Sequence, residues 1–530
     1  MMYQIKPNCL ILVMLLFLKL SIHESQAATY TVTRTDDPLP QECTVTSCSL
    51  REAVIAANNN PGEDVVLLMT DEYVLSLVGA VNDKFHTGDL DVLDTLIIRH
   101  VAPIDENDRF TILGNMNERV IDIHPNANLT LQNAVVTGGK TTGLGGGIMA
   151  RGGGTLIIKD SQISSNEASR GGALSLNDNQ VVMNAVSMTD NHVTDNGGGI
   201  YVLGSSQVTM NNVNVTGNTA KGGGGLYFGY LNEVNNQYNI HITNSFFGDN
   251  RAVNGGALNV QGSFGETAGS ILIENTDFVL NQAEQRGGAI YHLETQLTIK
   301  SSLFQLNQTE SNDAGVFGDG GAIYSDIVAD ISDLTIEQTL FERNRASHNG
   351  GGIHLEGNNT MITNTTFSNN KAGIHAAINA FSGDLSLKHV TIFTDGIDDS
   401  IDVLVGSGAS FDIQNSIIKG RCQVISINGF QSLGGNIESP GNSCGFGTGL
   451  NDLVNVAPRF LKLEDGLEDN GGSTRTHAIR YDYSFAVGNA ISIDTIKYDQ
   501  RHMSRDVMPD SGAFEVHESD LILIFKNGFE

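Results

Sequence analysis

The sequence contains no tryptophan, only 9 prolines, and half as many basic as acidic residues. Its 30 Lys and Arg residues against 60 Asp and Glu residues give a formal net charge of −30. A protein that binds nucleic acid or anionic lipid by charge needs a basic surface, so this balance argues against both classes of partner. Beyond the N-terminus, no apolar run approaches the ~20 residues of a membrane-spanning helix. We therefore expect no integral membrane segment in the mature chain.

The N-terminus is typical of an export signal. Lys6 supplies positive charge, residues 10–18 form an apolar stretch too short to span a membrane, and Ser25-Gln-Ala27 provides a small-x-small cleavage site. Cys9 precedes the apolar stretch, which argues against a lipid-modified cysteine. We therefore expect an exported chain that starts near Ala28.

Four cysteines remain after the signal, as two local pairs near opposite ends of the chain. Four cysteines allow three pairings, and the distance between the pairs favours Cys43 with Cys48 and Cys422 with Cys444. Such disulfides suit an oxidising, exported environment. A metal site made from all four is the alternative, although neither pair has the C-x2-C spacing typical of zinc ligands.

Two signatures recur eight times along the middle of the chain. One is Gly-Gly-[Ala/Gly]-[Ile/Leu]. Its last residue, Ile or Leu, recurs every 25–33 residues from Ile148 to Ile378, which ends a degenerate ninth copy. The other is an apolar residue, two variable positions and an Asn. A period of 20–50 residues indicates a solenoid. The repeated asparagines are Asn166, Asn191, Asn218, Asn250, Asn281, Asn307, Asn344 and Asn370.

One repeat unit, residues 197–222, shows how a coil would form. Three short segments of alternating apolar residues are separated by turns rich in Gly, Asn and Ser, and helical spacing is lacking. Three strands per unit make a triangular coil, and proline is nearly missing from the array, as expected where every coil pairs on both sides. We therefore predict an all-β fold, a right-handed parallel β-helix. Its repeated asparagines would form a buried structural ladder through their amide groups.

The repeat spacing breaks at residues 227–238, 264–267 and 311–319. We interpret these segments as loops outside the coil, where the function of a rigid solenoid usually lies. The first loop contains the one aromatic-rich patch, which we treat as a contact loop for a glycan or partner, with simple packing as the alternative. The patch consists of Tyr227, Phe228, Tyr230 and Tyr238.

Residues 48–58 predict a short amphipathic helix. Ser49 and Glu52 have the spacing of a capping box, and four apolar residues fall on one helical face. Because the open end of a solenoid exposes backbone and apolar surface, we expect this helix to cover the N-terminal end. We expect Glu52 to cap the helix and Arg51 to contact solvent.

Cys48-Ser-Leu-Arg-Glu-Ala-Val54 resembles the signature of the CSLREA family of exported bacterial proteins, and residues 88–92 and 119–122 resemble the first coils of that family. The repeats are similar to those of polymorphic outer membrane proteins, although residues 380–530 leave no room for that family's membrane barrel. The resemblance implies an extracellular protein, or one on the outer-membrane surface of a Gram-negative bacterium. The C-terminal part resembles a choice-of-anchor Q domain at residues 415–418, 434–437, 470–478, 499–501 and 510–515.

These observations divide the chain into consecutive parts. We expect a signal peptide at 1–27, an N-terminal cap at 28–95, β-helix repeats at 96–420, a C-terminal capping region similar to choice-of-anchor Q at 421–515, and a tail at 516–530.

Because pectin-degrading enzymes share the predicted fold, a catalytic site has to be considered. Asn275-Thr-Asp277 matches one polygalacturonase motif but occupies an ordinary repeat position, and Asp398-Asp399 lies several coils away. Gly441-Asn-Ser-Cys-Gly445 has nucleophile-elbow spacing without the required strand and helix, and His477 is most simply a packed residue. A carboxylate cluster with a basic neighbour in one groove would favour an enzyme.

We predict a non-catalytic protein, adhesin-like or structural, with a polysaccharide-active enzyme as the alternative. Its expected partners are glycans or proteins of a cell surface or matrix, and we expect a monomer. We predict no cofactor and no catalytic or metal-binding residues, with Ca²⁺ bound at Asp-lined turns as the alternative.

Overall fold

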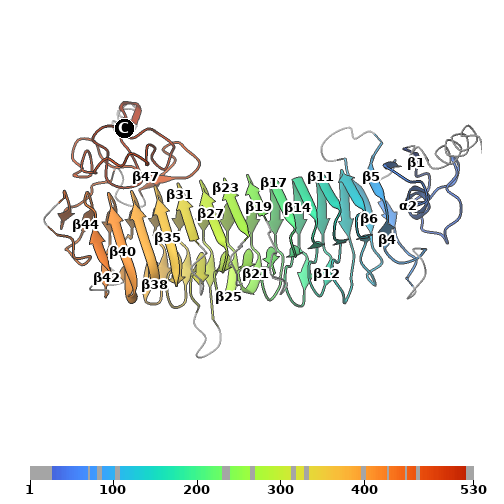
Figure 1. Cartoon of the computed structure of the whole chain (residues 1–530), viewed down its shortest axis with the longest axis horizontal. Coiled ribbons are helices and arrows are strands. Elements are labelled where there is room, and N and C mark those ends of the chain that lie inside the picture. The colour runs from blue at the N-terminus through green and yellow to red at the C-terminus, as the bar shows by residue number, and fades with distance from the viewer. Residues whose placement is uncertain are drawn as a thin grey trace, which may run out of the picture.

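The computed structural model describes residues 27–69, 72–79, 86–101, 108–229, 239–262, 269–311, 318–326, 333–395, 401–425, 429–447, 450–460 and 466–520. It is an elongated parallel β-helix whose coils stack along one axis (Figure 1). Among these residues, no helix is long and apolar enough to cross a membrane. Several predicted features lie outside the described residues: the signal up to residue 26, Tyr230, Tyr238, residues 264–267, Asp398-Asp399 and the tail from residue 521.

Each coil contributes strands to three faces, which we call A, B and C. Face A contains β4 (Leu90–Val92), β7 (Ile121–Ile123), β10 (Ile148–Arg151), β13 (Leu174–Asn177), β16 (Ile200–Leu203), β18 (Leu226–Phe228), β22 (Leu258–Gln261), β26 (Ile290–Leu293), β30 (Ile323–Asp326), β34 (Ile353–Glu356), the first parts of β38 (His375–Lys388) and β40 (Ile401–Gln414), and β42 (Cys422–Val424).

Face B contains β1 (Thr29–Thr31), β2 (Asp64–Leu68), β5 (Thr95–His100), β8 (Asn128–Gln132), the first parts of β11 (Thr155–Ser164), β14 (Gln180–Thr189) and β17 (Gln207–Thr216), then β19 (Asn239–Thr243), β23 (Ser270–Glu274), β27 (Gln296–Lys300), β31 (Asp333–Glu337), β35 (Asn358–Thr363), the ends of β38 and β40, and β43 (Phe430–Ser432).

Face C contains β3 (Glu72–Val74), β6 (Phe110–Leu113), β9 (Ala134–Thr137), the ends of β11, β14 and β17, then β20 (Phe246–Gly248), β24 (Asp277–Val279), β28 (Leu303–Gln305), β32 (Leu340–Glu342), β36 (Thr366–Ser368), β39 (Thr391–Phe393), β41 (Ile417–Lys419), β44 (Ile437–Ser439) and β45 (Leu453–Val454). A row of short strands, the corner row, joins face C to face A: β12 (Glu167–Ala168), β15 (His192–Val193), β21 (Arg251–Asn254), β25 (Gln282–Arg286), β29 (Gln308–Thr309), β33 (Arg345–Ala346) and β37 (Lys371–Ala372).

The pairing register follows the sequence repeat. Ile323 of β30 pairs with Ile290 on one side and Ile353 on the other, and the strands are parallel. On face C, Phe304 pairs with Phe278 and Phe341, and the Phe278 and Phe304 rings stack with centroids 4.7 Å apart. Equivalent side chains of successive coils therefore form continuous inward columns, as the repeat predicts.

The predicted asparagine ladder is confirmed. The eight side chains are at most 2% exposed, and each amide oxygen from Asn191 to Asn370 accepts a hydrogen bond from the Nδ2 of the asparagine one coil earlier. The same nitrogen donates to a backbone carbonyl of a neighbouring coil, as from Asn307 to Phe278 at 2.8 Å. These asparagines therefore have a structural role.

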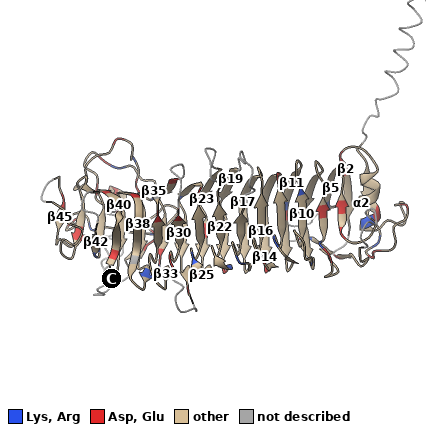
Figure 2. Cartoon of the chain, turned by 60° about the horizontal axis from the view of Figure 1, so that its bottom comes forward, with Lys and Arg blue, Asp and Glu red and all other residues tan. Residues whose placement is uncertain are grey.

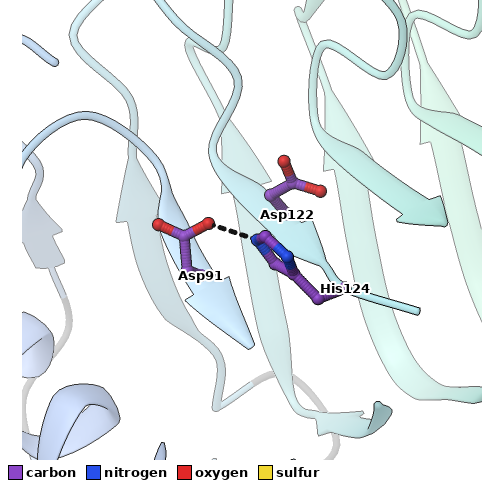
Figure 3. A group of neighbouring side chains, drawn as sticks. All are labelled: Asp91, Asp122 and His124. Atoms are coloured by element: carbon purple, nitrogen blue, oxygen red, sulfur yellow. Dashed lines mark hydrogen bonds and ion pairs between the residues drawn. The ribbon is translucent and has the colours of Figure 1, made fainter. Parts of the chain in front are cut away.

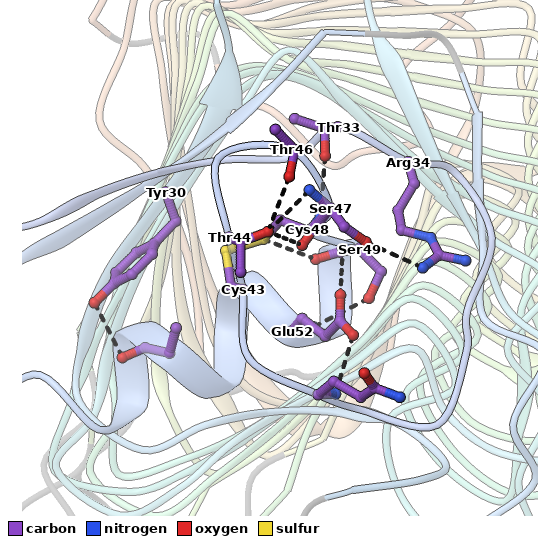
Figure 4. Close-up of a disulfide and its surroundings, with 12 residues drawn as sticks. Tyr30, Thr33, Arg34, Cys43, Thr44, Thr46, Ser47, Cys48, Ser49 and Glu52 are labelled. Carbon is purple, nitrogen blue, oxygen red and sulfur yellow. Dashed lines mark hydrogen bonds between the residues drawn. A yellow bond between two sulfur atoms is a disulfide. The ribbon is translucent and has the colours of Figure 1, made fainter.

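The N-terminal end is covered by the predicted helix, α2 (Leu50–Asn58). Both hydrogen bonds of the capping box between Ser49 and Glu52 are present, and the four apolar residues expected on one face are buried. The predicted disulfide between Cys43 and Cys48 is formed immediately before the helix (Figure 4). The sequence pattern thus correctly located this cap.

The prediction that Arg51 contacts solvent is wrong. Its side chain is 1% exposed and forms a two-point ion pair with Asp37, at 2.8 and 3.0 Å. The guanidinium also donates to the backbone carbonyls of Gly88 and Asp89 in the first coils. Arg51 therefore fastens the helix to the solenoid. Its partners are up to 38 residues away in sequence, so helix periodicity alone could not reveal this contact.

Parallel pairing extends past the expected repeat region, from β1 at the N-terminus to β45 near the C-terminus. The region 421–515 therefore divides into two parts. Its first part adds further strands and contains the predicted disulfide between Cys422 and Cys444. Residues 466–520 instead fold back beside the last coils (Figure 1) and include β46 (Leu467–Glu468) and β47 (Thr476–His477). They cover a side of the solenoid, whereas we expected an end cap.

Polar contacts hold this returning segment in place. Gln500 accepts a hydrogen bond from Thr366 at 2.6 Å, and Arg505 donates to Asn364 at 2.8 Å. Within the segment, Arg501 pairs with Asp499, and both side chains are at most 2% exposed. The residues that resemble a choice-of-anchor Q domain thus form much of a buried polar network.

Candidate functional site

Face A carries the most varied chemistry on its outward side. Along each strand the flanking Ile or Leu points inward, so the residue between them points outward. These outward positions align from coil to coil and form what we call the outer column. Figure 2 labels β10, β16, β22 and β30 of this face, in this order along the solenoid. The column runs through Asp91, Asp122, Met149, Ser175, Tyr201, Tyr227, Asn259, Tyr291, Tyr324, His354 and Asn379.

Tyrosines in the outer column stack face to face. The Tyr201 and Tyr227 rings have centroids 5.4 Å apart, those of Tyr291 and Tyr324 are 5.5 Å apart, and Tyr324 stacks on His354 at 5.2 Å. The four tyrosines are 0–9% exposed. Burial accordingly raises the pKa of Tyr227 to about 12. Because the ring faces are used in stacking, the tyrosines stiffen this face, and the polar groups beside them are the ones that remain partly exposed.

Charged side chains flank the column on the turn that precedes face A. Arg170 lies over the Tyr201 ring, 5.5 Å from its centroid, and forms an ion pair with Asp195 at 2.6 Å. Arg286 occupies the corresponding place over Tyr324, 4.8 Å from the centroid. Cation–π contact fixes both guanidinium groups while their polar edges remain partly accessible.

Two neighbouring carboxylates complete this part of face A. Asp326 and Glu356 are paired in register on β30 and β34, and both are partly exposed. Burial raises the pKa of Asp326, and the nearby Glu356 raises it further. A hydrogen bond from His354, 3.0 Å away, lowers the pKa of Glu356. Asn379 donates to the other ring nitrogen of His354 at 2.9 Å, which leaves Nε2 as the donor to Glu356.

The proposed aromatic contact loop needs correction. Tyr227 and Phe228 belong to strand β18 and are not part of a loop. Phe228 points inward, is 1% exposed and lies in the hydrophobic core, so it cannot contact a ligand. Tyr227 points outward, but its ring stacks on Tyr201 and its hydroxyl donates to Gln261.

A second polar cluster lies on the first coils of face A. Asp91 and His124 form a 2.7 Å hydrogen bond, and Asp122 lies beside them (Figure 3). Arg151 contacts both oxygens of Asp122, at 2.7 and 2.5 Å. Arg119 bridges Asp122 and Asp89, with its closest contact to Asp89 at 2.9 Å.

Asp89 has the most perturbed carboxyl group of this cluster. Burial raises its pKa to about 7, although Arg119 opposes the shift, while Asp91 and Asp122 add to it. Asp122 forms ion pairs with the guanidinium groups of Arg119 and Arg151. The cluster therefore places a carboxyl that can hold a proton near neutral pH beside a carboxylate that is charge-paired.

The ligand atoms of Asp91, Asp122 and His124 lie within 4.8 Å of one another, as a metal site would require. Arg151, however, occupies both oxygens of Asp122, and His124 contacts one oxygen of Asp91. Ca²⁺ also prefers six to eight oxygen ligands, whereas this group has two carboxylates and an imidazole. The cluster does not fit the Ca²⁺ site considered from the sequence, and we treat it as an ion-pair network.

Several residues within the enzyme-like motifs have structural surroundings, whereas Asp277 is exposed on β24. Thr276, within the Asn-x-Asp match, is fully buried, and its hydroxyl donates to the carbonyl of Glu274. Cys444, within the nucleophile-elbow match, is disulfide-bonded. His477 is 1% exposed, contacts Ser368 at 2.9 Å and stacks on a phenylalanine, which confirms it as a packed residue.

Sequence reasoning missed most of the outer column, although the repeat contained a signal for it. A tyrosine directly follows the last residue of the Gly-Gly signature in four repeats: Tyr201, Tyr227, Tyr291 and Tyr324. Since the signature's Ile or Leu points inward, the next residue must point outward. Arg286 could not be found in this way, because its contact with Tyr324 joins residues of different coils.

Residues 119–304 match the family model of the right handed beta helix region. The fold is thus a right-handed parallel β-helix, as the repeat predicts. The chain is similar to the crystal structure of pectate lyase Pel9A, with 11% identity, a TM-score of 0.32, and coverage of 93% of this chain and 97% of that chain. It is also similar to ORF18 of Geobacillus virus E2, with 11% identity, a TM-score of 0.26, and coverage of 82% and 66%. No curated protein sequence matches the chain.

Proposed function

We propose that this chain is an exported, non-catalytic surface protein that binds glycans through the polar groups of face A. The observation that carries the proposal is the set of partly exposed charged side chains beside the stacked tyrosines, from Arg170 to Glu356. The repeated Asn, Gly and Phe residues are used in stacking the coils, so they leave these variable groups as the functional part of the repeat.

The spacing of these groups suits an extended polar ligand. Solenoids offer long surfaces to elongated partners, and adjacent coils place equivalent residues ~4.8 Å apart along the axis. Guanidinium groups such as Arg286 donate hydrogen bonds, and carboxylates such as Asp326 and Glu356 accept them. A sugar hydroxyl group can accept a hydrogen bond from a guanidinium group and donate one to a carboxylate.

Export and surface location are part of the same proposal. The N-terminal sequence has the pattern of a cleaved signal, and the two disulfides suit an oxidising environment. The resemblance to CSLREA and choice-of-anchor Q proteins supports a place outside the cell. Fractionation of the source cells tests this part: protein in the outer membrane or medium is expected, and recovery only from the periplasm would contradict it.

Glycan binding can be tested with a glycan array and titration of the chain from residue 28. The double variant Asp326→Asn/Glu356→Gln should weaken binding at least about tenfold, because it removes both acceptor charges. Glu337→Gln is a matched control, since Glu337 lies on face B and its side chain is 36% exposed, like that of Glu356. Equal binding by the double variant and wild type would place the ligand elsewhere.

The acidic cluster of the first coils supports a second candidate, a polysaccharide-active enzyme. Acid–base chemistry on a glycosidic bond requires two carboxyl groups, one of which can hold a proton near the working pH. Asp89 would hold the proton near pH 7, and Asp122, which Arg151 contacts, would be the second carboxyl group. Release of reducing ends from a polysaccharide panel, abolished in Asp89→Asn, would support the enzyme. No release by the wild type would exclude glycosidic hydrolysis of those polymers.

A further inference from the structure

A shallow pocket on the corner row stands out by its charge. It has a volume of about 360 Å³ and lies where β33 and β37 follow the turns from face C. Three of its five lining residues are cationic, in a chain whose formal net charge is −30. Its lining consists of Arg343, Arg345, Asn369, Lys371 and Asp395.

Arg345 and Lys371 are directly paired in register on adjacent parallel strands. Their side chains therefore leave the backbone at neighbouring positions about 4.8 Å apart. Like charges at such positions repel one another and destabilise the pairing. The two preceding positions of the same row are neutral glutamines, Gln282 and Gln308. The repeat therefore does not require charge here.

No described carboxylate forms an ion pair with Arg345 or Lys371. Some surface cations elsewhere in the described structure have ion-pair partners: Arg251, in the same row, pairs with Asp249, and Lys300 pairs with Glu337. Among the described residues, Arg345 and Lys371 are thus two neighbouring cations without an ion-pair partner.

The third cation, Arg343, has partners of its own. Arg343 lies 3.8 Å from Glu342, but Glu342 also accepts hydrogen bonds from Arg475 and Gln305. The remaining carboxylate that lines the pocket is Asp395. Because Arg343 has other partners, the charge available in the pocket comes from Arg345 and Lys371, which against this one acid leave a formal excess of one positive charge.

We infer that this pocket binds the acidic group of an anionic polysaccharide, a carboxylate or a sulfate. An anion between Arg345 and Lys371 replaces their repulsion with two attractions. The planar guanidinium fork matches carboxylate and sulfate oxygens. Asn369 accepts from the backbone of Asp395 at 2.7 Å through its side-chain oxygen, which leaves its NH₂ group to donate. The volume is near the lower end for small-ligand sites and suits a sugar unit.

This binding is separate from that proposed for face A, which uses other residues and does not require an acidic sugar. The chain from residue 28 should be titrated with oligogalacturonate as the carboxylate probe, a heparin oligosaccharide as the sulfate probe, and maltotriose as the neutral probe. We expect at least one acidic probe to bind. Its affinity should fall at least about tenfold between 50 mM and 500 mM salt, because charge attraction is screened.

The deciding variant is Arg345→Gln/Lys371→Gln. Because glutamine already occupies two positions of this row, the variant should fold, which circular dichroism and the thermal midpoint would verify. It should bind the acidic probe at least about tenfold more weakly. Arg251→Gln is the matched control, as it removes a paired cation from the same row and should retain wild-type affinity.

Three results would overturn the inference: no binding of either acidic probe, undiminished binding by the double variant, or equal binding of maltotriose. Comparison of the two acidic probes shows which acidic group the pocket takes. The face A variant Asp326→Asn/Glu356→Gln leaves the pocket intact. Loss of neutral-glycan binding in that variant therefore concerns face A, whereas loss of acidic-probe binding in Arg345→Gln/Lys371→Gln concerns the pocket.

Discussion

Asn307 donates a hydrogen bond from Nδ2 to the Oδ1 of Asn344, 2.9 Å away and one coil further along the solenoid. Its own oxygen accepts bonds from both the backbone and the side chain of Asn281. Every amide group of Asn307 is therefore used in the interior. A side chain that joins three coils in this way connects their stability as well as their geometry.

Asn307→Ala should destabilise the protein by about 2–4 kcal/mol, because it leaves buried groups of both neighbouring coils without partners. The free energy of unfolding in urea measures this. Asn184→Ala is the control: Asn184 accepts a hydrogen bond from the next coil at 3.2 Å on the surface, where water can replace it. A similar decrease in the free energy of unfolding for both variants would show that burial does not determine how much the ladder stabilises the protein.

Phe304→Ala should cost about 3–5 kcal/mol, because it creates a cavity in a fully buried ring column. The ring stacks on Phe278 at 4.7 Å and on Phe341 at 4.8 Å, so the neighbours also lose contacts. Phe246→Ala, at a position 38% exposed, should have a much smaller effect. Unfolding midpoints of the two variants test the difference. A loss below about 1 kcal/mol for Phe304→Ala would contradict a rigidly packed column.

Arg51→Gln should destabilise the N-terminal cap by about 3–5 kcal/mol, since it leaves the buried carboxylate of Asp37 without its ionic partner. Hydrogen exchange of the amides in α2 would show whether the loss is local. Arg34→Gln removes an ion pair from the exposed part of the same segment and should leave protection unchanged. If the amides of α2 are equally protected from exchange in both variants, Arg51 does not hold the helix in place.

His292 gives the interior a defined pH dependence. It is fully buried, with Ser325 and the carbonyl of Thr295 as partners, and burial lowers its pKa to about 4. Between pH 6.5 and 4 the unfolded chain therefore takes up the proton first, so stability falls as pH falls. By pH 4.5 this proton uptake lowers the free energy of unfolding by about 2–3 kcal/mol.

The variant His292→Gln should lack this contribution. Its free energy of unfolding should thus fall less than that of the wild type between pH 7 and pH 4.5, whatever its absolute stability. His192→Gln, at an exposed position, should retain the wild-type pH dependence. Parallel curves for the wild type and His292→Gln would show that His292 accepts a proton without penalty in the folded state.

A contact could be predicted from the sequence when both of its residues belong to the repeat. The column that contains Ile290 and the ladder that contains Asn307 were predicted correctly, because each residue meets its own equivalent one coil away. Arg51 was misplaced because its partners Asp37 and Asp89 belong to no repeat. Phe228 was assigned to a loop because the inserted segment after it obscured the strand.

The sequence by itself determined the scaffold: two local disulfides, a capping helix, and coils stacked through Gly, Asn and Phe positions. The disulfides and the helix formed as expected, and export remains a prediction. Only the tertiary structure showed which contacts the variable side chains make. It brought Arg286 over Tyr324, placed Asp326 beside Glu356, and left Arg345 next to Lys371 without a counterion in the described chain. Asp326 with Glu356 and Arg345 with Lys371 occupy equivalent repeat positions, so the stacking of coils makes them neighbours. Their burial, and whether an opposite charge lies within reach, depend on how the surrounding turns and strands pack.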